Sequence, residues 1–135
     1  MTAGRRRKVF IVLDIVGLVA IVLLIPFVLS NKSAMANIDC SGKIGANHVM
    51  IIQNSKVTPT HITAPLCDTL TITNKDNIER FVAFGPHEDH VAYDGITEKV
   101  LTQGQTFKVT LVQAGNFRFH DHIHDEVQGT FTVTK

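Results

Sequence analysis

The chain has 135 residues, of which 44% are hydrophobic, so it holds at most one domain besides any targeting segment. Its formal net charge is +1, but residues 37–135 carry eight basic and eleven acidic residues, a net charge of −3, together with all seven histidines. These residues contain no basic stripe, which excludes nucleic acid as an expected partner.

The first 36 residues predict a membrane anchor rather than part of the domain. A basic cluster at residues 5–8 precedes an apolar run of 21 residues that is broken only by Asp14 and Pro26. About 20 apolar residues span a bilayer, whereas the apolar core of a secretory signal usually has about 7–15. The basic cluster should stay in the cytoplasm, which puts the domain on the outer face of the cell membrane. The expected parts are a cytoplasmic tail (1–8), a transmembrane helix (9–29), a linker (30–44) and a domain (45–135).

A cleaved secretory signal is the alternative interpretation of this segment. An Ala-x-Ala pattern ends at Ala36 and would place the cleavage after that residue. The length of the apolar run favours the retained anchor, and either interpretation leaves the domain outside the cytoplasm. In an oxidising compartment we expect Cys40 and Cys67 to form a disulfide, with a two-thiol metal site as the alternative.

The remaining sequence has the pattern of short β-strands. Residues 106–111 alternate cleanly, which points Phe107, Val109 and Leu111 inward. Residues 114–116 are expected to form a turn, after which Phe117 and Phe119 point inward. Further strands are expected in residues 48–53, 56–63, 68–74, 80–84 and 130–134. No stretch after residue 36 has helical periodicity, so six to eight strands in about 100 residues predict an all-β sandwich or small barrel.

Three segments resemble the cupredoxin family in order and content. VTPTHITAPLCDTLTITNKDNIERFVAF (57–84) is similar to the middle of a cupredoxin, and QGQTFKVTLVQAGNFRF (103–119) is similar to the strands that lead into its copper loop. GTFTV (129–133) is similar to the closing strand. The resemblance covers residues 45–135 and implies a cupredoxin-like Greek-key β-sandwich.

The ligands of a blue-copper site are mostly missing from this pattern. That site needs a cysteine, two histidines and usually a weak axial methionine. The family's loop, Cys-x-x-His-x-x-Met-x-Gly, aligns with residues 121–129 and puts Asp121 at the cysteine, His124 at the histidine and Val127 at the methionine. The first histidine would fall near Glu79 or Arg80. One ligand of four survives, so we reject a blue-copper electron carrier.

Two short histidine motifs indicate a different metal site. The chain resembles cysteine-free, single-domain cupredoxins that have Pro-His-x-x-His and His-Asp-His segments, and this resemblance implies four ligands: His87, His90, His120 and His122. Spacing supports the same four, because side chains at i and i+2 of a strand share a face and a single turn brings i and i+3 to one side. His124 is a further candidate ligand. Asp121 is expected to accept hydrogen bonds from loop amides or to orient a ligand imidazole.

An all-imidazole site suits copper(II), zinc or nickel, and the order of affinities favours copper, with zinc as runner-up. We therefore expect a membrane-anchored outer domain that binds copper for acquisition, buffering, delivery or redox work. The alternatives are a small copper redox enzyme acting on superoxide or a similar oxidant, and a metal-free structural or adhesion ectodomain. The sequence indicates no particular protein partner.

Overall fold

The computed structural model describes residues 37–135. The expected membrane anchor and the alternative cleavage site both lie outside the described residues. Within residues 37–135, no helix has the length and apolar character needed to cross a bilayer.

The described chain forms nine strands. They are β1 (Asn47–Gln53), β2 (Lys56–Thr58), β3 (His61–Pro65), β4 (Thr69–Asn74), β5 (Arg80–Phe84), β6 (Glu98–Leu101), β7 (Thr106–Thr110), β8 (Gly115–Asp121) and β9 (Gln128–Thr134). The expected all-β fold is confirmed, but the expected count of six to eight is too low. The run expected at 56–63 is two strands, separated around Pro59, and β6 was not expected because three of its four residues are exposed. The expected turn at 114–116 is also wrong, since β8 already begins at Gly115.

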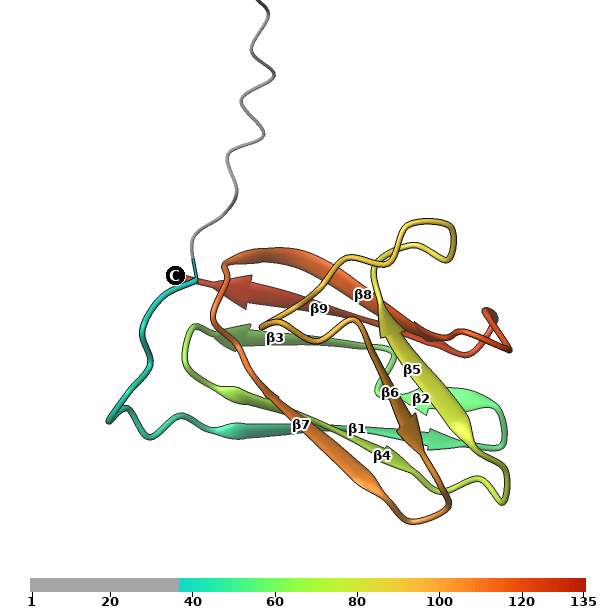
Figure 1. The fold of residues 1–135 in the computed structure, drawn as a ribbon. Coiled ribbons are helices and arrows are strands. Elements are labelled where there is room, and N and C mark those ends of the chain that lie inside the picture. The colour runs from blue at the N-terminus through green and yellow to red at the C-terminus, as the bar shows by residue number, and fades with distance from the viewer. Residues whose placement is uncertain (1–36) are drawn as a thin grey trace, which may run out of the picture. The chain divides into compact units, whose positions relative to one another are not determined.

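The strands make two sheets that lie face to face, as Figure 1 shows. One sheet has the order β2-β1-β4-β7 and the other the order β3-β9-β8-β5-β6. The pairs β1–β4 and β3–β9 are parallel, and the remaining pairs are antiparallel. A long connection joins β5 to β6. On its other side, β5 pairs with the last residues of β8.

Apolar side chains from both sheets fill the space between them. Met50, Leu70 and Ile72 of the four-stranded sheet are completely buried, as is Phe119 of the five-stranded sheet. The alternation expected in β7 is confirmed, since Phe107, Val109 and Leu111 are buried. This core fixes which side of each strand faces inward, and therefore which side carries the polar residues discussed below.

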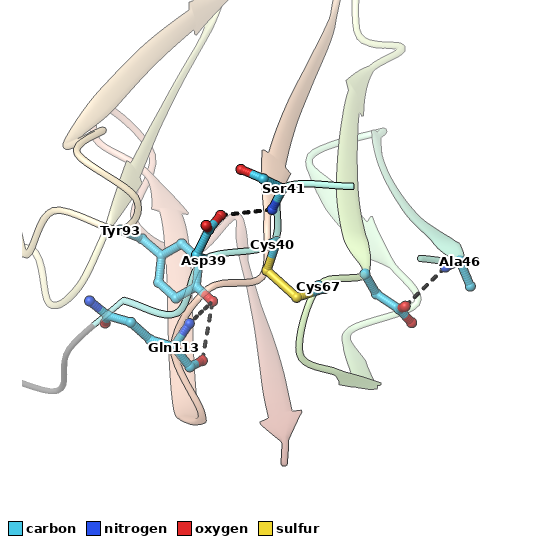
Figure 2. The surroundings of a disulfide bond; sticks show 8 residues. Asp39, Cys40, Ser41, Ala46, Cys67, Tyr93 and Gln113 are labelled. Atoms are coloured by element: carbon cyan, nitrogen blue, oxygen red, sulfur yellow. Dashed lines mark hydrogen bonds between the residues drawn. A yellow bond between two sulfur atoms is a disulfide. The ribbon is translucent and has the colours of Figure 1, made fainter. Parts of the chain in front are cut away.

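The start of the domain is fastened by a disulfide between Cys40 and Cys67, whose Cα atoms are 5.3 Å apart (Figure 2). The expected disulfide is confirmed, and the alternative two-thiol metal site is excluded. Cys67 lies in the turn between β3 and β4, and its N–H donates to the carbonyl of Leu111 over 2.8 Å. The Ile38 N–H donates in the same way to Val112 over 2.9 Å, so part of the expected linker is attached to the sandwich.

Candidate metal centre

The alternation of β8 divides its side chains between two environments. Phe119 and Asp121 share one side of the strand and are 0% and 1% exposed, with Phe119 in the core. His120 and His122 therefore project from the opposite side, away from the core. His120 is nevertheless 0% exposed, so another part of the chain must cover this outer side of the sheet.

The covering segment is the first part of the connection between β5 and β6. Gly85 donates its N–H to the carbonyl of Arg118 in β8 over 3.1 Å, which holds the segment against that strand. A turn follows, in which the Asp89 N–H donates to the carbonyl of Pro86 over 3.1 Å. Gly85 has φ +88°, and a Cβ there would lie 2.7 Å from the nitrogen of Val91. Only glycine fits this corner, and the corner directs the two histidines of the Pro-His-x-x-His motif over β8.

The four histidines of the two motifs come together in space. The ring centroid of His87 lies 5.5 Å from that of His120 and 5.2 Å from that of His122. For His90 the corresponding distances are 5.2 and 4.6 Å. His87 and His90 are farther apart, at 6.4 Å. Each histidine of the turn therefore neighbours both histidines of the strand.

These distances fit rings that surround one ion. With a metal–nitrogen distance of about 2.0–2.1 Å, a ligating ring has its centroid roughly 3.2 Å from the metal, so adjacent rings of a square site lie about 4.5 Å apart and opposite rings about 6.4 Å. In a tetrahedral site every pair would be about 5.2 Å apart. The observed distances run from 4.6 to 6.4 Å, and three of the five are 5.2–5.5 Å, so they fall in the range that these two geometries require.

Several ring nitrogens in this cluster are buried without a hydrogen-bond partner. They are Nδ1 and Nε2 of His120 and Nε2 of His90, and among the described residues the only other buried side-chain polar atom of this kind is Nε of Arg118. Buried polar groups are nearly always paired, so these unpaired nitrogens need an explanation, such as an ion bound by one nitrogen of each ring. Burial lowers the pKa of His120, and the charges of Arg118 and His90 lower it further, against an opposing effect of Asp125. A neutral imidazole is the form that binds a metal.

A carboxylate that the motifs did not reveal completes the cluster. Glu98, the first residue of β6, lies with its Oε2 2.7 Å from Nδ1 of His122. Two groups each have donor atoms within 4.8 Å of one another: His87, His90 and His120 in the first, and His90, Glu98 and His122 in the second. The sequence EKVL has no alternation or metal-ligand spacing, so no signal in it pointed to Glu98.

His124 stands apart from these groups. Its side chain is 44% exposed, and its nearest acidic neighbour is Glu126, with Nδ1 3.8 Å from Oε1. It belongs to neither set of converging donors.

Asp121 takes part in a buried ion cluster on the core side of β8. Its Oδ2 accepts from Nη1 of Arg80 over 2.9 Å, and its Oδ1 accepts from the N–H groups of Phe81 and Ile123 over 3.3 and 3.1 Å. Arg80 also donates to Asp76 over 2.5 and 3.1 Å. Asp121 stands at the cysteine of the blue-copper pattern, and Arg80 stands near its first histidine. In this chain the two residues form an ion pair instead.

Comparison with known proteins identifies the family of this fold. The model of the cupredoxin-like domain matches residues 18–133, which is most of the chain. The chain belongs to the cupredoxin-like family. No curated protein matches this cupredoxin.

Among solved structures, the chain is similar to a purple cupredoxin from Nitrosopumilus maritimus. The two are 19% identical with a TM-score of 0.57, over 64% of this chain and 98% of that one. A reduced mutant of amicyanin is 18% identical with a TM-score of 0.56, over 75% of this chain and 94% of its own, and a Cu(I) form of another amicyanin mutant gives the same values. At these identities the likeness establishes the cupredoxin fold alone.

Proposed function

We propose that this cupredoxin binds one copper(II) ion through four imidazoles, those of His87, His90, His120 and His122. The observation that carries the proposal is the close approach of these four rings, two of which, those of His90 and His120, have buried nitrogens without a hydrogen-bond partner. The site takes up and holds the ion for acquisition, buffering, delivery or slow redox work. The membership of the chain in a family with structures in a Cu(I) form supports copper as the ion.

The donor set supports copper(II) over the runner-up, zinc, because copper(II) stands above zinc in the order of affinities that divalent metals have for nitrogen ligands.

A blue-copper electron carrier is not the role we propose. Both cysteines are in the disulfide, so neither supplies the thiolate on which that spectrum and its tuning depend. Asp121, which stands at the cysteine position of the blue-copper pattern, is instead paired with Arg80 over 2.9 Å.

Copper titration of the purified full chain tests this function. We expect one tightly bound Cu(II), a nearly colourless complex, and a paramagnetic resonance spectrum with the wide parallel splitting of tetragonal, nitrogen-ligated copper. Because the ligands must be neutral imidazoles, protons compete with the metal and binding should weaken as the pH is lowered.

Histidine variants assign the ligands. Replacing His120 and His122 together by Ala should abolish tight binding, and replacing His87 and His90 should do nearly the same. His124→Ala is the matched control and should cost much less, because this ring lies outside both donor sets. If His124→Ala alone removes the copper while the His120/His122 variant retains it, the four-histidine assignment is wrong.

We further propose that the protein is anchored in the cell membrane by residues 9–29, with residues 1–8 in the cytoplasm, a linker over 30–44 and the domain of 45–135 on the outer face. The basic cluster and the length of the apolar run support this arrangement. Mass spectrometry of the protein from its native membrane should find the chain uncleaved. A mature N-terminus at Asn37 would instead indicate a secreted domain.

A further inference from the structure

Five donor side chains rather than four meet at this site, in two overlapping sets. His87, His90 and His120 form one set, and His90, Glu98 and His122 form the other. Only His90 belongs to both. Because His90 is shared, the two sets overlap and can serve as two positions of a single ion.

Both sets have exposed members, since His87 is exposed as well as Glu98 and His122, but only the first set includes a completely buried ligand. His120 is 0% exposed, so an ion arriving from water cannot meet it first. The side chains of Glu98 and His122 are 34% and 43% exposed. An ion therefore reaches the set that contains Glu98 while the buried ligand is still out of reach.

The two positions also differ in charge. Glu98 is an acid whose ion-pair partner in residues 37–135 is His122 alone, so no lysine or arginine neutralises it. Asp125, the acid nearest to His120 at 3.9 Å, is instead paired with Arg118 over 2.9 Å. A dication is thus attracted more strongly to the Glu98 set than to the neutral imidazoles beneath it.

We propose that Glu98 is a temporary ligand, which captures the incoming copper ion together with His90 and His122. The copper–oxygen bond to Glu98 then breaks as copper–nitrogen bonds to His87 and His120 form, while His90 and His122 stay bound. The ion remains Cu(II) throughout. This inference rests on the proposed copper site and adds the route by which that site is filled and emptied.

Binding kinetics of Glu98→Gln test the proposal, with the full chain and a fluorescent copper chelator in a stopped-flow competition assay. A residue that contacts the ion only during its entry and release changes the activation barrier of binding, but not the free energies of the copper-free and copper-bound states. We therefore expect the association and dissociation rate constants to fall together by about tenfold or more, with the dissociation constant unchanged within about threefold.

Glu126→Gln is the matched control, because it removes the same charge from an exposed acid beside His124 and should leave both rates nearly unchanged. The proposal is overturned if Glu98→Gln weakens equilibrium affinity by about 10–100-fold at an unchanged association rate, as expected for a permanent orienting partner. It is also overturned if Glu98→Gln and the control behave alike. If the unmodified chain binds no copper, the proposed function itself is wrong. If it binds copper tightly and Glu98→Gln leaves the rate constants unchanged, only the proposed capture by Glu98 is wrong.

Discussion

Asp121→Asn should destabilise the domain strongly, although the side chains of aspartate and asparagine have nearly the same shape. Asn can still accept the hydrogen bonds from the amides of Phe81 and Ile123, but it carries no charge for Arg80. Both members of this ion pair are buried, with side chains 1% and 0% exposed. A buried guanidinium that loses one of its two carboxylates cannot recover the loss from water.

The expected loss is about 3 kcal/mol of the free energy of unfolding, at the lower end of the roughly 3–5 kcal/mol seen when one partner of a buried pair is removed. The lower end applies because Arg80 keeps Asp76 and the hydroxyl of Ser55 as partners. For a domain of this size the melting temperature should fall by at least about 12 °C.

Asp125→Asn is the matched control, since it makes the same chemical change in an ion pair whose side chains are 34% and 50% exposed. Such exposed pairs contribute about 0–1 kcal/mol. Urea unfolding of the copper-free full chain, followed by circular dichroism, measures both variants. Equal losses below about 1 kcal/mol would refute the reasoning, because burial would then add nothing to the pair with Arg80.

Three further outcomes follow from the structure. Gly85→Ala should weaken copper binding by more than about tenfold, because Gly85 has a positive φ and no room for a Cβ. Gly95 also has a positive φ but lies in open space, so Gly95→Ala should lower the free energy of unfolding by about 1 kcal/mol and leave the copper affinity intact. Burial would raise the pKa of Asp76, but hydrogen bonds from a buried arginine and two amides outweigh this effect and lower the pKa below 3.8. Asp76 therefore stabilises the fold above about pH 4, and this stability should be lost as the pH falls through the pKa that Asp76 has in the folded state. A free energy of unfolding in urea that stays constant from about pH 5 to 2.5 would contradict this. Replacing Cys40 and Cys67 by Ser should cost roughly 3–4 kcal/mol, because the bridge closes a loop with a sequence separation of 27, and equal urea midpoints would argue against it.

The strands of the sandwich could be predicted from the sequence where one face of the strand is buried and the other is exposed to solvent. In β7 the alternation of Phe107 and Val109 with polar neighbours is complete, and the strand lies where it was expected. The prediction failed where that contrast is absent. β6 is nearly all exposed, and Gly115 is read as a turn residue although its φ of 144° is compatible with the start of β8.

The histidines of the candidate site could be picked out from the sequence because their two motifs are local. Spacing of i and i+2, or of i and i+3 in a turn, is visible in one sequence, whereas the pairing of β5 with β8 that brings the motifs together is seen only in the structure. Glu98 shows the limit of this approach. It reaches His122 only because β6 pairs with β5 at the edge of the sheet, and no local pattern encodes that register.

The two polar clusters occupy opposite sides of the same strand, and this division explains why the metal site we propose is not the blue-copper site of the family. On the core side, Asp121 stands where the blue-copper pattern has a thiolate, and its carboxylate is already paired with the buried guanidinium of Arg80. Val127, at the methionine position, is completely buried and offers no donor atom. On the outer side, His120 and His122 meet the turn that begins at Gly85, where the nearby charges of Glu98 and Asp125 are negative. Asp121 links the two sides, because its hydrogen bond from the Ile123 N–H fixes the course of the chain just after His122. The ion pair therefore takes up the carboxylate at the cysteine position of the blue-copper pattern, and Asp121 also fixes the chain beside His122, one of the ligands that we propose.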